Sequence, residues 1–508
     1  MTHLSYASAL VLAFTLAGCA VGPDFKQPEA PKSERYTATS IDLNNMATGQ
    51  TIETDASVAA DWWKMFKSEQ LSTLIAQGLA NSPTIRMAEA RLKEAQENLS
   101  AQVGSVLYPA VDGQASSSKQ KISGAGFGGR PSIYNIHNAS VSASYGLDLF
   151  GGSRRYLEGL KAKIDFEQYQ LQAARITLAA NIVTAAVQEA SLRSQIAATE
   201  QIIVDSEMQL EMVEKQFALG VVAQGIVLNQ RTALAQARTT LPALQKQLQQ
   251  NRHLLNVLTG QLPAGAELPA FTLASLQLPQ ALPLSLPSEL VRQRPDILAA
   301  EALLHQASAN VGVATANLYP HITLTGSFGT ENSQIANLFT TGSTVWGAGA
   351  GLVQPLFHGG ELRAKRRAAK AAYEQAEASY RETVLQAFRD VADTLLALEM
   401  DGRTLALQRD AAAAASDAYA LTDVQYKAGS ASYLELLNAS QQYQRATIDL
   451  AQAEAVRFAD SAALIHALGG GWWHEPTADK PEVHASETQK SEAHEPETQP
   501  VTTTETQE

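Results

Sequence analysis

The chain has little charge, one cysteine and no long apolar run after its first residues. Charged residues make up 18% of the 508 positions, below the ~25% of ordinary soluble proteins, so part of the surface is expected to avoid water. The single cysteine excludes a disulfide framework, a thiolate zinc site and an iron–sulfur cluster. Beyond the N-terminus no stretch approaches the length of a spanning helix, so further membrane contact would have to be made by strands.

Positive charge and catalytic groupings are also scarce. The formal net charge is −13, and residues 475–508 account for much of it with nine acids and two lysines. No basic patch is available to neutralise phosphates, which argues against a nucleic-acid partner. The ten histidines show no metal-ligand spacing, and no Ser/His/Asp set or phosphate-binding glycine loop is present. We therefore expect no enzymatic activity, no cofactor and no metal.

Residues 1–18 have the form of a signal peptide. The apolar run 6–18 is too short to span a bilayer. It ends in Leu16-Ala17-Gly18-Cys19, which resembles the bacterial lipobox, in which the cysteine is acylated. An ordinary secretory signal with a chance cysteine is the alternative. The only cysteine in the chain falls where a lipobox needs it, so we expect Cys19 to carry the lipid.

The rest of the chain is an internal duplication. Ser82-Pro83-Thr84-Ile85 recurs as Arg294-Pro295-Asp296-Ile297 at an offset of 212, and Tyr108-Pro109 recurs as Tyr319-Pro320 at 211. Further landmarks follow in the same order. They are Leu149-Phe150 with Leu356-Phe357, and Gln216-Phe217-x-x-Gly220 with Gln425-Tyr426-x-x-Gly429.

Each half is predicted to contain a short helix, two strands and two further helices. Residues 139–149 are apolar at every odd position and polar or glycine between, and 321–328 alternate in the same way, as strands with one apolar face do. The predicted helices 153–217 and 361–427 would each be roughly 100 Å long at ~1.5 Å per residue. In each half two shorter helices sum to nearly that length, namely 84–107 with 222–259 and 296–318 with 431–468. This predicts four helical columns of equal height, with strands at one end and glycine turns at the other.

Four strands cannot close a barrel alone. An amphipathic sheet has unpaired edges that must be closed in lipid, and transmembrane barrels start at ~8 strands. The barrel would therefore be shared among two, three or four copies of the chain. The sequence arithmetic does not choose among these numbers.

Four motifs are distinctive in combination: Cys19-Ala-Val-Gly-Pro-Asp-Phe25, Trp62-Trp63-x-x-Phe66, Arg294-Pro-Asp296, and Gln425-Tyr426-x-x-Gly429 followed by Tyr433-Leu434-x-Leu436. In these motifs the sequence resembles the TolC-like outer membrane efflux family, in its lipoprotein (NodT/OprM-like) branch associated with resistance-nodulation-division pumps. The resemblance covers about residues 20–474. It implies a homotrimer with a twelve-stranded barrel in the outer membrane of a Gram-negative bacterium, continued by a helical tunnel across the periplasm. It also implies two protein partners, a periplasmic adaptor and an inner-membrane pump.

The family's tunnel closes at the end that carries the glycine turns, here Gly220 and Gly429. Counted from Gly429, the family's ring of pore-narrowing residues corresponds to Glu435 and Asn438, with Asp423 as a lesser candidate. Ser432-x-x-Glu435 is also a capping box, so Glu435 is expected to gate the pore, to cap a helix, or to do both. Asp423 has the alternative of lying on a solvated face.

The sequence thus predicts a mainly α chain with a β-barrel part, serving as the passive exit duct of a tripartite efflux system. Two alternatives stay open: an exit duct for type I protein secretion, and a lipid-anchored periplasmic coiled-coil scaffold without a pore. The expected organisation is a signal peptide at 1–18, a lipid-anchored segment at 19–65, a first repeat at 66–265, a second repeat at 266–474 and a disordered polar tail at 475–508.

Overall fold

The computed structural model describes residues 20–33, 35–37, 49–54, 56, 58–122, 131–264 and 268–474. Cys19, the signal peptide and the polar tail, on which three of the expectations fall, lie outside these ranges. Among the described residues, no helix has an apolar stretch of the length and hydropathy that crossing a membrane requires.

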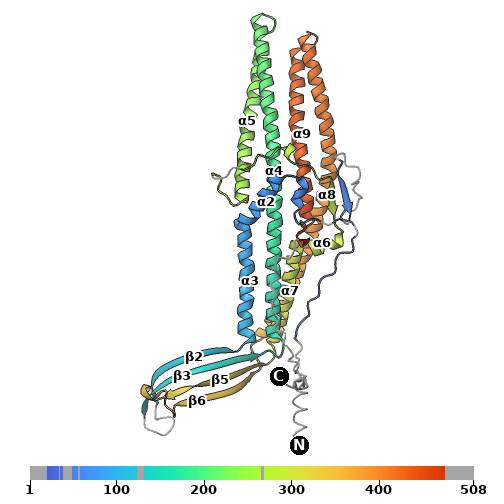
Figure 1. The fold of residues 1–508 in the computed structure, drawn as a ribbon. Coiled ribbons are helices and arrows are strands. Elements are labelled where there is room, and N and C mark those ends of the chain that lie inside the picture. Colours follow the sequence, from blue (N-terminus) through green and yellow to red (C-terminus); the bar gives the residue numbers. More distant parts are fainter. Residues whose placement is uncertain are drawn as a thin grey trace, which may run out of the picture.

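Long helices dominate the structure (Figure 1). Each half has a short helix before its strands, then one very long helix and one of intermediate length. In the first half these are α3 (Pro83–Leu107), α4 (Gly152–Ala218) and α5 (Gln224–Leu258), and in the second half α7 (Pro295–Ala316), α8 (Glu361–Lys427) and α9 (Tyr433–Ala467). Both α4 and α8 have 67 residues, so the predicted long helices are confirmed to within a residue at each end.

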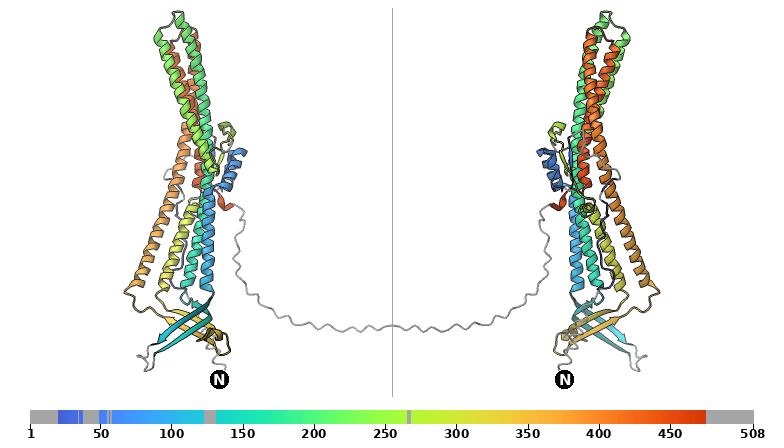
Figure 2. Two further views of the ribbon diagram at one scale, coloured as in Figure 1. Left: turned by 90° about the vertical axis from the view of Figure 1, so that its left-hand side faces the viewer. Right: turned by 90° about the vertical axis from the view of Figure 1, so that its right-hand side faces the viewer.

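The helices form one curved layer rather than a closed bundle (Figure 2). Near the sheet the order across the layer is α3, α4, α7 and α8, and farther away it is α5, α4, α9 and α8. The long helices α4 and α8 therefore run through both levels, while α3 with α5 and α7 with α9 stack end to end. These are the four columns that the helix lengths predicted.

The strands form one antiparallel sheet in the order β2-β3-β5-β6. The bounds are β2 (Ala110–Ile122), β3 (Ser132–Leu147), β5 (His321–Asn332) and β6 (Thr344–Val353). Each strand continues the helix next to it, so the strand order repeats the helix order. On the outer sides of β2 and β6 the described residues supply no further strand.

Pairing of the strands gathers the apolar residues on one face. Val141 lies opposite Phe328, and Phe328 lies opposite Trp346, so three strands contribute to one apolar row. The neighbouring row on the other face pairs Ser142 with Ser327. Phe328 and Trp346 are 65% and 77% exposed, which leaves this apolar face uncovered within a single chain. The two-faced strands predicted from the alternation at 139–149 and 321–328 are confirmed.

The main hydrophobic core lies halfway along the helices, where residues 58–81 and 268–293 pack against them (Figure 1). A short helix α2 (Glu69–Asn81), a 3-10 helix η1 (Trp62–Phe66) and the parallel pair of β1 (Thr51–Thr54) with β4 (Ala281–Leu284) belong to this region. Trp62 and Phe66 are almost fully buried in the core. Arg294 pairs with Asp296 at 2.6 Å and donates to the carbonyl oxygen of Ala467 at 3.0 Å. Two of the motifs that carry the family resemblance, Trp62-Trp63-x-x-Phe66 and Arg294-Pro-Asp296, are therefore packing and anchoring elements.

Gly260 and Gly220 offer a matched test of this packing. Both have φ +75°, but a Cβ on Gly260 would lie 2.5 Å from the carbonyl oxygen of Asn81, whereas nothing lies within 4 Å of one on Gly220. Alanine at either position should lose roughly 1–2 kcal/mol to the left-handed backbone. Gly260→Ala must also displace the end of α2, so its midpoint of thermal unfolding should fall clearly further than that of Gly220→Ala. Equal shifts would show that α2 yields without loss.

Candidate functional site

The two helical hairpins at the end remote from the sheet have the same turn. Gly220 follows α4 with φ +75° and Gly429 follows α8 with φ +79°. Val221 N–H donates to the Gln216 carbonyl at 2.9 Å, and Ser430 N–H donates to the Gln425 carbonyl at the same distance. This is the hydrogen bond with which a left-handed glycine closes a helix. The two glycines lie at the tips of the two hairpins.

Glu435 lies in the first turn of α9 and forms a capping box with Ser432. Its Oε2 accepts the Ser432 backbone N–H at 2.6 Å, and the Ser432 hydroxyl accepts the Glu435 N–H at 3.3 Å. The backbone hydrogen bond lowers the pKa of Glu435 below its ordinary value of 4.5, so the carboxylate stays charged at neutral pH. The side chain is also exposed. One carboxylate therefore caps the helix and remains available to ions.

The other two candidates differ in how their polar groups are engaged. Asn438 is exposed and contributes no charge. Asp423, half-buried near the end of α8, accepts an ion pair from Lys427 at 2.6 Å. The structure thus brings the three candidates to one hairpin, but only Glu435 presents a carboxylate without a cationic partner among the described residues.

The sequence did not reveal a set of Tyr–Gln hydrogen bonds between the two hairpins. Tyr426 donates its hydroxyl to Gln216 Oε1 at 2.7 Å, and Tyr433 donates to Gln230 Oε1. Gln230 is fully buried and also donates to the Ser206 carbonyl at 3.0 Å. Burial raises the pKa of Tyr433, which keeps its phenol protonated as a donor. These bonds tie α9 and the end of α8 to the α4–α5 hairpin.

Alignment of the two halves contains one sequence signal of these hydrogen bonds between the hairpins. Phe217 stands where Tyr426 stands in the second half, so the hydroxyl occurs in only one of two equivalent positions. Gln230 carries no such signal, because no local pattern distinguishes a buried amide from an exposed one.

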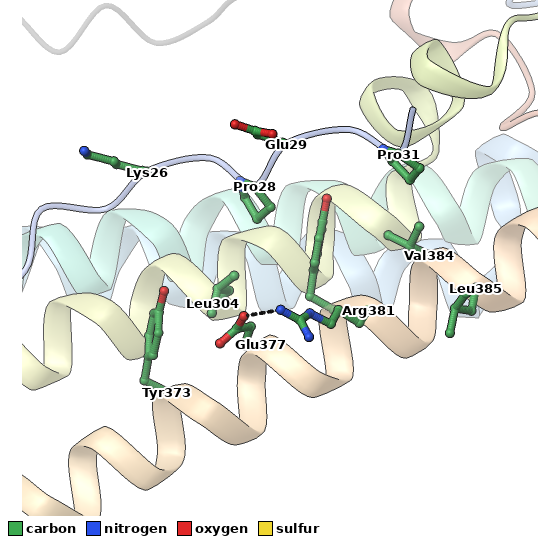
Figure 3. Close-up of a pocket in the computed structure, with 11 residues that line it drawn as sticks. Lys26, Pro28, Glu29, Pro31, Leu304, Tyr373, Glu377, Arg381, Val384 and Leu385 are labelled. Carbon is green, nitrogen blue, oxygen red and sulfur yellow. Dashed lines mark hydrogen bonds and ion pairs between the residues drawn. The ribbon is translucent and has the colours of Figure 1, made fainter. Parts of the chain in front are cut away.

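A groove of about 530 Å³ lies where the extended N-terminal segment, residues 20–33, crosses the helical layer (Figure 3). Lys26 and Pro28 form one wall, and Tyr373 and Tyr380 of α8 belong to the other. Its α8 side also carries Glu377 and Arg381, which pair with each other at 2.7 Å. Among the residues that line it there is no set of catalytic groups, and the described residues hold no cluster of metal ligands.

Near the sheet, the same N-terminal segment is held to the helices. Arg155 pairs with Asp24 at 2.5 Å and with Glu158 at 2.8 Å, and Val21 N–H donates to the Phe150 carbonyl at 3.0 Å. Residue 20, the neighbour of Cys19, therefore lies at the junction of sheet and helices.

Comparison with known proteins identifies the family. The family model described as outer membrane efflux protein matches residues 74–261 and 286–470. The pyoverdine export outer membrane protein OpmQ of Pseudomonas aeruginosa is 31% identical over 482 residues, covering 93% of this chain and 97% of that protein. The cation efflux system protein CusC of Escherichia coli is 27% identical, covering 91% and 97%.

Solved structures agree with the sequence comparison. The outer-membrane channel OprN superposes with a TM-score of 0.83 at 28% identity, covering 89% of this chain and 100% of that one. The fold predicted from the sequence, a helical tunnel wall continued by strands, is the fold of these channels. The chain belongs to the outer membrane efflux protein family.

Proposed function

We propose that the protein is the passive exit duct of a tripartite efflux system, which carries substrates from an inner-membrane pump across the periplasm and the outer membrane. The observation that carries this proposal is the sheet with one uncovered apolar face and two open edges. A periplasmic scaffold has no use for such a sheet, whereas a membrane pore needs it. No chemical step is assigned to the chain.

Three copies complete the duct. Each supplies four strands and four helical columns, so a homotrimer has a barrel of twelve strands and a tunnel wall of twelve columns. Copies join through the open edges, β6 and α8 of one copy meeting β2 and α3 of the next. The periplasmic adaptor and the resistance-nodulation-division pump are the proposed protein partners, and the hairpin tips at Gly220 and Gly429 face them.

The proposed domain plan is the one expected from the sequence. Residues 1–18 are proposed to be removed, 19–65 to form the lipid-anchored segment, and 66–265 and 266–474 to be the two repeats. The names of two relatives state different exported substrates, pyoverdine for OpmQ and cations for CusC. Because proteins of the same fold export both, we assign the choice of substrate to the pump.

Conductance in planar bilayers and the effect of a genomic deletion together separate the proposal from its two alternatives. The purified full chain should insert and give stable, ion-conducting steps of one size. A scaffold would give no conductance. A type I protein secretion duct would also conduct, but a genomic deletion would then abolish secretion of a protein and leave susceptibility to small toxic molecules unchanged.

The lipid anchor is tested at Cys19. Wild-type cells grown with radioactive palmitate should yield a labelled mature protein, because the thiol is the acylated group. Cys19→Ser removes that thiol, so label should disappear and uncleaved precursor accumulate. Labelling that survives the substitution would refute the anchor.

Glu435 is proposed to narrow and charge the pore mouth, since symmetry brings its copies together around one axis. Glu435→Ala should raise single-channel conductance and weaken block by divalent cations. Glu435→Gln keeps an oxygen that can accept the Ser432 N–H but loses the charge, so it should weaken block while preserving the helix cap. Ser432→Ala, which removes the hydroxyl that accepts the Glu435 N–H but keeps the Glu435 charge, serves as the control.

The pH dependence follows from the lowered pKa of Glu435. A depressed carboxyl pKa keeps the charge present above the ordinary value of 4.5, so divalent block should be constant from neutral pH down to that value. It should be lost as the pH falls through the lowered pKa. If divalent cations block the Glu435→Gln pore as strongly as the wild-type pore, Glu435 caps the helix and does not gate the pore.

A further inference from the structure

We propose that Phe357 of one copy stacks on Tyr108 of the next copy, where α8 of the first copy lies against α3 of the second. The inference rests on the proposed ring of copies and names the contacts that join them. It uses the internal duplication as a template, because a contact made between halves inside one chain should recur between chains when the ring closes.

The aromatic contact has an internal precedent. Phe150, between β3 and α4, stacks on Tyr319, before β5, with ring centroids 4.7 Å apart and planes 17° apart. The counterparts in the repeat are Phe357, between β6 and α8, and Tyr108, before β2. Phe357 is 87% exposed and Tyr108 is 64% exposed.

These two exposed rings cannot meet within one chain. The helices beside them, α8 and α3, lie on opposite edges of the helical layer (Figure 2). A second copy placed edge to edge brings its α3 beside α8, as α7 lies beside α4 inside the chain. Tyr108 of that copy then takes the place that Tyr319 occupies against Phe150, and both exposed rings are covered.

The helix contact has a precedent as well. A Cβ added at Gly159 of α4 would lie 3.6–3.9 Å from three residues of α7, so the two helices touch there. Because α4 and α8 have equal lengths, Ala368 occupies the position of Gly159 in α8. The three α7 residues are Gln306, Ala309 and Asn310, and their counterparts in α3 at the offset of 212 are Glu94, Glu97 and Asn98.

Cysteines at the two aromatic positions test the stack. Phe357→Cys with Tyr108→Cys in the full chain, treated with a short thiol-specific cross-linker, should give covalent oligomers on denaturing gels. The wild type, whose only cysteine is Cys19, controls for background. Phe150→Cys with Tyr319→Cys is the matched control, because the stack it replaces is within one chain and should link without raising the mass.

The outcomes separate this inference from the proposed function. A ladder ending at three copies supports both the stack and the trimer. A ladder ending at another number supports the stack and contradicts the trimer. Monomers only, from a protein that conducts in planar bilayers, would overturn the stack and leave the duct standing.

Discussion

Backbone hydrogen bonding in the four-stranded sheet is the constraint on which the rest of the molecule depends. Pairing runs from β2 through β3 and β5 to β6, and each interior strand is satisfied on both sides. The outer strands expose polar groups that cost several kcal/mol each in lipid. Since each strand continues a helix, whatever closes the sheet must also close the helical layer, and one requirement sets the form of the whole wall.

The middle of the molecule is held by buried polar groups as well as by the apolar core. Arg457 is fully buried and donates to Gln50 Oε1 at 2.5 Å, and Gln50 donates to the Pro279 carbonyl at 2.7 Å. Glu189, also fully buried, takes ion pairs from Arg193 and Arg252. Removing one partner of such a pair costs about 3–5 kcal/mol, because the other charge is left uncompensated. These groups fix Gln50, Leu268 and Pro279 onto the helices, far from both the sheet and the tips.

Periodic and punctuating residues made most of the fold predictable. Proline-free runs gave the long helices, strict alternation gave the strands, and glycines gave the tips, because each depends on neighbours in sequence. The order of the helices and the opposition of Val141 to Phe328 depend on distant residues, so no local pattern reports them. At the site, Ser432 and Glu435 could be recognised as a capping box, whereas the bond of Tyr433 to Gln230 joins positions with no sequence signal in common.

The continuous course of α4 and α8 gives the wall a mechanical property. Each of these helices has 67 residues and passes two different sets of neighbours, so it acts as a rigid lever held near its middle and at the sheet. Beyond the core roughly 50 Å of each helix extends to the hairpin tip, and a bend of about 5° above the core moves that tip by roughly 4 Å. The displacement grows along the free part of the helix, so the contacts in the core and at the sheet stay in place. The tips of the hairpins can therefore move while the packing of the lower wall hardly changes.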